Sequence, residues 1–237
     1  MTDDATLQRL IDEIVADVAA ANNPYFRALQ SGDLTKDDFV ETQVQFYSAV
    51  VFFSRPMAAL AAKIPTPDLR VEVVRNVWEE HGEGNPGRMH ARTFATFLER
   101  LAGIGLADIE ARTVWPEVRL FNTALAGACV LEDYRVGAAM LGMIERTFCE
   151  QSAWIGRAVV ARGWLRPEEL VHYTVHEVLD VRHAQDFFDV VRPSWNAGAE
   201  HRDTIEQGLR LGAVTFDRLW EDLYRHRARR LFAGKRA

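Results

Sequence analysis

The stretch YTVHEVLDVRHAQDFFDVV, residues 173–191, is the most informative part of this chain. Successive residues of an α-helix turn by about 100°, so positions 176, 180 and 183 fall within about 40° of one direction. Phe187 continues that direction among apolar neighbours, which indicates that this face points inward. The stretch therefore predicts a helix that presents His176, Asp180 and His183 on a buried face.

Two imidazoles and a carboxylate on a buried face need an explanation. Burying ionisable groups is unfavourable unless they are paired or bind a metal. A mixed set of nitrogen and oxygen ligands suits iron, manganese or zinc. The alternative is a polar helix face on which Asp and His hydrogen-bond to each other. Residues 176–183 alone leave both interpretations open.

Helical periodicity extends outward from this stretch, and no segment alternates convincingly like a β-strand. The pattern predicts helices over residues 6–21, 25–30, 35–56, 67–80, 88–101, 116–131, 133–161, 167–192 and 198–231. The third of these is expected to kink or end at Pro56. Without internal repeats or linker-like segments, we expect one all-α domain spanning residues 1–237, a bundle of about eight helices.

Composition argues against several classes of function. The 237 residues are 48% hydrophobic and 26% charged, with a net charge of −6 and a pI near 5.7. This acidic balance argues against nucleic acid as a partner, since phosphate binding needs clustered Lys and Arg. No run of about 18 apolar residues occurs, so no membrane-spanning helix is expected. Two cysteines and an acidic N-terminal stretch unlike a signal peptide favour a cytoplasmic location.

Further ligands are available elsewhere in the chain. Glu145 directly follows the apolar run AAMLGMI, residues 138–144. A carboxylate on an apolar helix face either binds a metal or pairs with an Arg or Tyr. The sequence leaves these two interpretations equally open for Glu145.

The segment WEEHGEGNPGRMH, residues 78–90, is dense in carboxylates and imidazoles. Its glycines interrupt the helical pattern between Glu80 and His90, which would let ligands from two helix ends converge. His90 shares a face with apolar residues, whereas Glu79 and Glu83 fit a solvated surface. Three carboxylates and three imidazoles on helices would suit two metal ions bridged by carboxylate.

This pattern resembles that of the haem-oxygenase-like diiron oxidases, whose superfamily also includes haem oxygenase, the thiaminase-type enzymes and the pyrroloquinoline-quinone-forming oxidase. The similarity runs from Asn23 to about Val191. Its markers are the NPYF opening, a Glu and a His around a Gly/Pro break, a Glu on the middle helix and a later His-x3-Asp-x2-His run. The resemblance implies the metal ligands Glu80, His90, Glu145, His176, Asp180 and His183, with Glu83 as the alternative to Glu80.

The resemblance also implies a fold and a chemistry. We expect a haem-oxygenase-like bundle that binds two Fe(II) ions, with manganese possible at one site, and uses dioxygen as co-substrate. The expected reaction is N-oxygenation or oxidative cleavage of a small amine or amino-acid-derived substrate in natural product biosynthesis. Oxidative decarboxylation of a fatty acid is the alternative. An external electron donor and a homodimer are further expectations, since relatives tend to dimerise.

Residues that contact the substrate are less specific. Three tyrosines are candidates for the pocket wall: Tyr25, Tyr47 and Tyr173. Four arginines could hold a carboxylate, although each also fits a solvated helix face: Arg119, Arg146, Arg157 and Arg182. In relatives that form 4-aminobenzoate, a sacrificial tyrosine lies near position 25, and a lysine follows the middle Glu. Residues 146–155 contain no lysine, so we disfavour that activity.

Three other classes remain as alternatives. A thiaminase-like hydrolase would need a Cys nucleophile, and Cys129 and Cys149 are available. A haem oxygenase would need a His in the first helix, whereas no His precedes His81. A non-catalytic helical protein would bind no metal and would need no inward-facing carboxylates.

Overall fold

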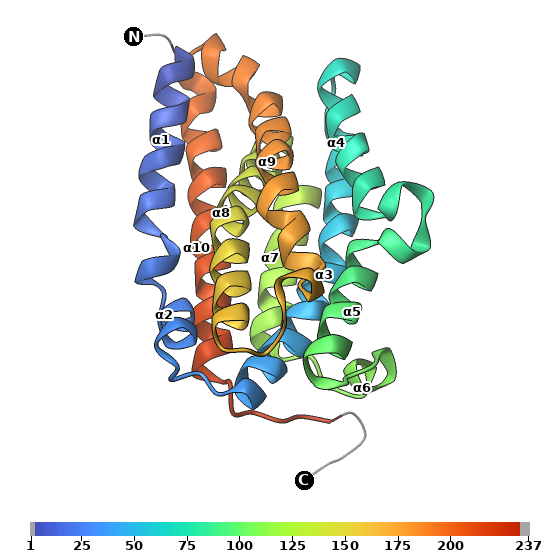
Figure 1. Ribbon diagram of the computed structural model, residues 1–237. Coiled ribbons are helices and arrows are strands. Elements are labelled where there is room, and N and C mark those ends of the chain that lie inside the picture. Colours follow the sequence, from blue (N-terminus) through green and yellow to red (C-terminus); the bar gives the residue numbers. More distant parts are fainter. Residues whose placement is uncertain (1–2, 233–237) are drawn as a thin grey trace.

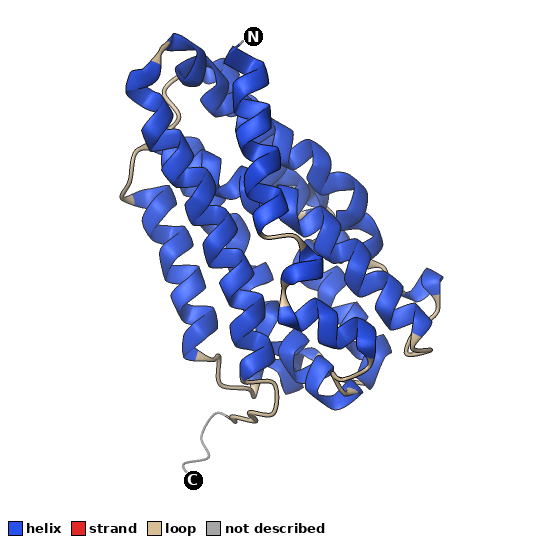
Figure 2. Cartoon of the chain, turned by 90° about the vertical axis from the view of Figure 1, so that its left-hand side faces the viewer, coloured by secondary structure: helices blue, strands red, loops and turns tan. Residues whose placement is uncertain are grey.

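Ten α-helices make up most of residues 3–232, the part described by this computed structural model, which leaves out the side chains of residues 3 and 175–179. No segment within this part forms a β-strand (Figure 2), so the all-α prediction is confirmed. The helices are α1 (Asp3–Asp17), α2 (Pro24–Ser31), α3 (Lys36–Lys63), α4 (Pro67–Glu80), α5 (His90–Ala102), α6 (Leu106–Glu110), α7 (Pro116–Val130), α8 (Tyr134–Ala161), α9 (His172–Ala197) and α10 (Ala199–Arg225).

Several helices begin where a short polar side chain can cap them. The side chain of Asn23 accepts a hydrogen bond from the backbone N–H of Tyr25 at 2.9 Å, and Pro24 occupies the first turn of α2. Thr35 caps α3 and Asp133 caps α8 in the same way. Such caps satisfy N–H groups that have no partner within the helix. They explain why the starts of α2, α3 and α8 were predictable.

Helix α8 lies at the centre of the bundle (Figure 1), and every residue from Gly137 to Glu145 is buried. Helices α9 and α10 pack closely against it. At Gly142 an added Cβ would lie 2.7 Å from the ring of Phe188, and at Gly212 it would lie 2.5 Å from the carbonyl oxygen of Met140. Glycines at these two contacts therefore let α9 and α10 pack closely against α8.

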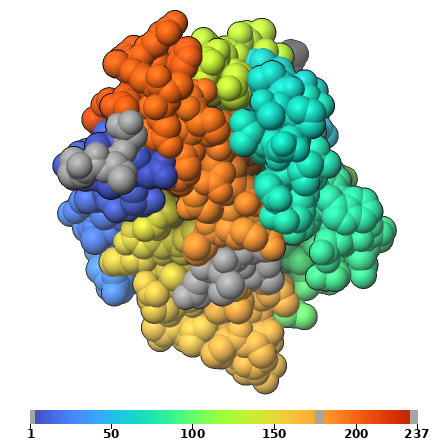
Figure 3. Space-filling model, turned by 90° about the horizontal axis from the view of Figure 1, so that it is seen from above, coloured from blue at the N-terminus to red at the C-terminus, as the bar shows by residue number. Residues whose placement is uncertain are grey.

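Helix α9 lies between α1 and α4 when the molecule is seen from above (Figure 3). It contacts α8 and also both helices of the α4–α5 pair. This position brings residues of α4, α5, α8 and α9 into one region of the interior.

Several helix boundaries differ from the prediction. Helix α3 continues through Pro56, and α9 continues through Pro193 to Ala197. A proline removes one backbone hydrogen bond, and packing beyond it can compensate. Beyond Pro193, Trp195 is buried and donates a hydrogen bond from Nε1 to Thr6 Oγ1 at 3.1 Å. The short helix α6 was not predicted, because five residues show no clear period.

The last helix ends at Arg225, earlier than the predicted residue 231. Two of the basic residues that follow form ion pairs with acidic residues of other helices. Arg229 pairs with Glu117 at 2.9 Å, and Arg230 pairs with Asp38 at 2.9 Å. None of the described helices is long and apolar enough to cross a membrane.

Candidate metal centre

The glycine-containing break between α4 and α5 brings Glu80 and His90 together. Gly82 and Gly84 have φ values of 67° and 80°, which favour glycine, and a Cβ at Gly82 would lie 2.6 Å from the backbone nitrogen of Met89. The turn therefore reverses the chain sharply. Glu80 Oε1 lies 2.8 Å from His90 Nδ1, and both side chains are buried.

Glu83, the alternative ligand, lies in this turn with a φ of 55°. Its side chain is exposed and forms an ion pair with Arg88 at 3.2 Å. Of the two carboxylates, Glu80 is the one that faces the interior.

Helices α8 and α9 contribute Glu145, Asp180 and His183, which are all buried. His183 Nδ1 lies 3.7 Å from Glu145 Oε1, which is too long for a hydrogen bond. Neither of these two atoms has a hydrogen-bond partner among the described residues. Glu145 therefore does not fit the interpretation of a structural carboxylate neutralised by an Arg or a Tyr hydroxyl.

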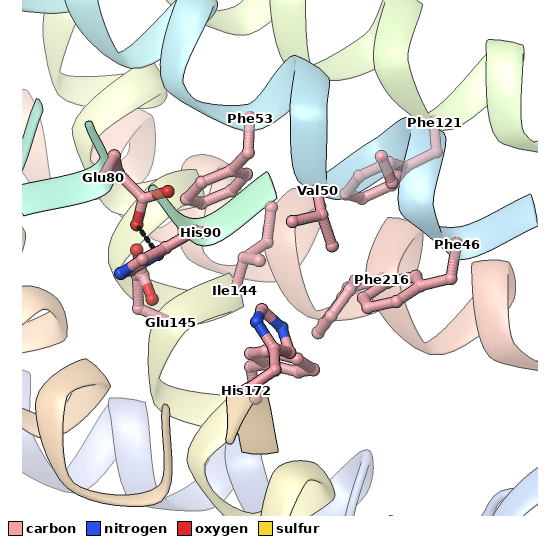
Figure 4. Close-up of a pocket in the computed structure, with 12 residues that line it drawn as sticks. Phe46, Val50, Phe53, Glu80, His90, Phe121, Ile144, Glu145, His172 and Phe216 are labelled. Carbon is pink, nitrogen blue, oxygen red and sulfur yellow. Dashed lines mark ion pairs between the residues drawn. The ribbon is translucent and has the colours of Figure 1, made fainter. Parts of the chain in front are cut away.

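Glu80, Glu145 and His183 form a group that could hold a metal ion. One ligand atom from each lies within 4.8 Å of the others, and all three residues are buried. Glu80 and His90 lie beside Glu145 at one end of the cavity in Figure 4. Asp180 and His90 are close enough to affect the charges of this group. The side chain of His176 lies outside the described residues.

Electrostatics in this cluster reflect an excess of buried carboxylates. Burial, and then the neighbouring carboxylate of Asp180, raise the pKa of Glu145 to about 7. Burial also raises the pKa of Asp180 well above its ordinary value. A divalent cation would relieve this unfavourable charge, because it interacts favourably with the ionised forms.

The pKa values of the two imidazoles are raised as well, which favours their charged forms. Burial disfavours the charged form of His183, but Glu145, Glu79 and Asp180 outweigh it and raise its pKa to about 10. Burial likewise opposes the charge on His90, and Glu80 outweighs it, so the pKa of His90 is raised. Without a metal, protons on these imidazoles balance part of the carboxylate charge.

Glu79 does not lie on a solvated surface, and that interpretation was wrong. Only 12% of its side chain is exposed, and its Oε2 lies 2.8 Å from Nε2 of His183. Adjacent residues of a helix point about 100° apart, so Glu79 can face α9 while Glu80 faces α5.

A small apolar cavity of about 50 Å³ extends from the carboxylate cluster (Figure 4). Its polar lining consists of Glu80, His90 and Glu145 at one end and of His172, which lies apart from them. The rest of its wall is aliphatic and aromatic, and comes from α3, α7, α8 and α10: Phe46, Ala49, Val50, Phe53, Phe121, Ile144, Phe148 and Phe216.

The three tyrosines proposed for the pocket wall lie outside this lining among the described residues. Tyr25 is buried and hydrogen-bonds to Thr42 at 2.8 Å, while Tyr173 donates a hydrogen bond to Gln43. Tyr47 borders a separate groove on the outer side of α3. None of the four proposed arginines lines the cavity either, and Arg182 pairs with Glu79.

His172 is a residue that the sequence analysis missed. It is fully buried at the first turn of α9, its Nδ1 lies 3.2 Å from Thr93 Oγ1, and its ring packs at 4.7 Å from that of Phe94. An isolated His next to Tyr173 gave no spacing signal. Only the position of the start of α9 beside α5 brings it to the cavity.

Comparison with known proteins identifies the class of protein. The chain belongs to a family described as iron-containing redox enzymes, whose model matches residues 40–215. A relative from Chlamydia muridarum named 4-aminobenzoate synthase is 22% identical over 177 residues, which cover 74% of this chain and 73% of the relative.

Solved structures confirm the haem-oxygenase-like fold. A TenA homologue from Pseudomonas syringae matches with a TM-score of 0.75 at 16% identity and covers 92% of both chains. A CADD-like protein of unknown function from Nostoc punctiforme has a TM-score of 0.75 at 14% identity, covering 94% of this chain and 97% of that one. A protein from Shewanella denitrificans described as having a haem-oxygenase-like fold gives 0.69 at 13% identity, covering 94% and 90%.

Proposed function

We propose that the protein is a non-haem diiron oxidase that uses dioxygen to oxidise a small organic substrate. The observation that supports this most directly is the buried group of Glu80, Glu145 and His183, whose ligand atoms lie within 4.8 Å of one another. Glu145 Oε1 and His183 Nδ1 lack hydrogen-bond partners in the described part of the protein, although buried polar atoms are nearly always satisfied. Membership of an iron-containing redox family agrees with a metal at this position.

The donor set fits ferrous iron. Glu80, His90 and Glu145 would hold one ion, while His176, Asp180 and His183 would hold the other, with Glu145 or Asp180 bridging. Bound ferrous ions would supply electrons and open coordination positions for dioxygen. The protein residues hold the ions, and the apolar cavity wall excludes water from the reacting group.

The lining of the cavity bears on the substrate. We expected a small amine or an amino-acid-derived compound, whose charged groups would need polar partners. Beyond its four polar residues, however, the described lining is entirely aliphatic and aromatic. This favours a substrate with one polar end at the metals and an apolar body, such as a hydrophobic amine or, as the second candidate, a fatty acid undergoing oxidative decarboxylation.

Formation of 4-aminobenzoate, the activity named for the Chlamydia muridarum relative, fits less well. The chain has lysines only at positions 36, 63 and 235, so α8 contains none after Glu145. Since the resemblance associates that activity with a lysine there, we do not propose it.

A thiaminase-like hydrolase fits less well too. Burial raises the pKa of both Cys129 and Cys149 to about 12, and a thiol is a weak nucleophile unless it ionises. Cys149 donates a hydrogen bond to the carbonyl oxygen of Glu145 at 3.3 Å, and neither cysteine lines the cavity.

Anaerobic titration with Fe(II), followed by exposure to air, tests the proposal. The protein should bind about two ferrous ions per chain, as dinuclear helical bundles do, and should then consume dioxygen. Glu80→Gln should bind less iron, whereas Glu83→Gln, three residues away on the surface, should behave like the wild type. A wild-type protein that binds no iron tightly, or equal effects of the two substitutions, would contradict the proposal.

Substrates can then be compared by dioxygen uptake of the iron-loaded protein. The panel is medium-chain fatty acids, hydrophobic amines and free amino acids. We expect turnover with one of the first two groups. Turnover with polar amino acids alone would show that the apolar cavity does not hold the substrate.

A further inference from the structure

We propose that Glu79 is a positioning residue, which fixes the orientation of His183 and leaves its Nδ1 as the atom that binds metal. The inference rests on the proposed metal centre, and it concerns a residue outside the six proposed ligands. It follows from the two distances made by the His183 ring. Nε2 lies 2.8 Å from Glu79 Oε2, and Nδ1 lies 3.7 Å from Glu145 Oε1.

The two ring nitrogens of His183 have different surroundings. Nε2 is engaged by Glu79, so its proton is directed away from the other carboxylates. Nδ1 faces Glu145 and has no hydrogen-bond partner among the described residues. A neutral imidazole carries one proton, and a carboxylate acceptor at Nε2 holds that proton there. Nδ1 is then free to donate its lone pair to a cation.

Glu79 is itself held in place by two arginines. Its Oε2 forms an ion pair with Arg182, and its Oε1 lies 3.9 Å from Arg75 Nε. Cations beside a carboxylate stabilise its ionised form, so Glu79 can accept the Nε2 proton of His183.

The position of Glu79 in the chain has a second consequence. It lies at the C-terminal end of α4, directly before Glu80. One helix end thus supplies a carboxylate that faces His90 of α5 and a second that faces His183 of α9. The orientation of α9 relative to the carboxylate cluster is linked in this way to the end of α4.

Carboxylate partners of metal-binding histidines fix the tautomer and the direction of the ring, and their loss typically weakens metal binding about 10- to 100-fold. We expect this of Glu79→Ala. In Glu79→Gln the amide oxygen can still accept the Nε2 proton, so most of the affinity should return. Glu83→Ala is the matched control, because Glu83 lies in the next turn but is exposed and pairs with Arg88.

Two measurements test the role without using enzyme activity. The first is titration of the metal-free full-length protein with Co(II) alone, followed by visible absorption. The second is ¹⁵N NMR of the Zn(II)-loaded protein, in which His183 should keep a proton on Nε2 and show a metal-shifted Nδ1. In Glu79→Ala that Nε2 proton should exchange rapidly with water, and Glu79→Gln should restore its protection.

The outcomes separate this inference from the metal centre itself. If the wild-type protein binds neither Co(II) nor Zn(II), both the proposed metal centre and the proposed role of Glu79 are contradicted. If the wild type binds metal and the Glu79→Ala and Glu83→Ala variants bind it with equal affinity, only the proposed role of Glu79 is contradicted. Zinc bound to Nε2 of His183 would contradict that role as well. If Glu79→Ala fails to fold, the NMR signal of the Nε2 proton of His183, compared between the wild type and Glu79→Gln, still tests the role of Glu79.

Discussion

The Nδ1 atom of His183 and the Oε1 atom of Glu145 face each other at 3.7 Å between α9 and α8, at a distance that no hydrogen bond spans. Gly142, three residues before Glu145 on α8, packs against Phe187 and Phe188 of α9, so the two helices are close here. Two facing polar atoms without partners are unfavourable in a tightly packed interior. We interpret the gap as space for a shared ligand, and this interpretation makes the following predictions.

Replacing Glu145 with Met should stabilise the metal-free protein. The substitution keeps the length of the side chain and removes a buried carboxylate that lies beside Asp180. Replacing buried ionic groups by well-packed apolar ones often stabilises by about 1–4 kcal/mol. Urea denaturation of metal-free protein should show a larger free energy of unfolding, and Co(II) titration of the same variant should show weaker binding.

Glu41→Met provides the contrast. Glu41 is also buried, but its Oε2 accepts a hydrogen bond from Arg112 Nε at 3.1 Å and lies 3.6 Å from Arg230 Nε. Removing this carboxylate leaves Arg112 and Arg230 without their acidic partner, so the free energy of unfolding should fall. A loss of stability in both variants would mean that Glu145 is a structural residue.

The stability of the metal-free protein should decrease as the pH rises from about 6 to about 10. The folded-state pKa of Glu145 is raised to about 7, and that of His183 to about 10. The folded protein therefore binds more protons than the unfolded chain, and linkage gives a negative slope of stability against pH. The contribution of His183 is complete below its ordinary pKa of 6.5 and is lost as the pH passes about 10.

Differential scanning calorimetry of metal-free protein at several pH values measures this slope. Zn(II) should reverse the trend, because binding requires deprotonated ligands and so strengthens as the pH rises. The Glu145→Met variant serves as the control and should show a shallower slope when metal-free. An unchanged slope in that variant would mean that other groups are responsible.

Much of the fold was predictable because its signals are local. The apolar run before Glu145 predicts the buried middle of α8, and Asp133 predicts its start. The convergence of Glu80, His90, Glu145, Asp180 and His183 followed from helix faces and from the resemblance together. Their role as ligands stays a prediction, as does that of His176.

What the sequence did not reveal depends on contacts between distant residues. Glu79 and Glu80 are equivalent as neighbours in a helix, and only the position of α9 shows that Glu79 meets His183, 104 residues later. Pro193 carries a local signal for a helix end, which the packing of Trp195 overrides. The apolar cavity is formed by seven helices, so no single segment indicates its shape.

Gly212→Ala should destabilise the protein at the contact of α10 with α8. The new Cβ would lie 2.5 Å from the carbonyl oxygen of Met140, and backbone atoms cannot move aside without separating the helices. Overpacking of this kind costs about 1–3 kcal/mol. Gly127→Ala in α7 is the control, since nothing lies within 4 Å of its Cβ position, and there alanine should stabilise the helix by up to about 1 kcal/mol. Thermal unfolding of the two variants should shift in opposite directions, and a parallel shift would contradict the close packing.

Ala49→Phe should shorten the substrates that the enzyme accepts. Ala49 is buried on α3 and lines the apolar part of the cavity. A phenyl ring there would fill the space in which we propose that the apolar body of the substrate binds. Each methylene that loses its apolar contact costs about 0.8 kcal/mol, or about fourfold in kcat/KM. Dioxygen uptake measured over a series of chain lengths should therefore fall most for the longest substrates, while Fe(II) binding stays at the wild-type level. Ala58→Phe, on the exposed side of the same helix, should leave the profile unchanged. A uniform loss at every chain length in Ala49→Phe would instead indicate damage to the metal centre, and would place the substrate body elsewhere.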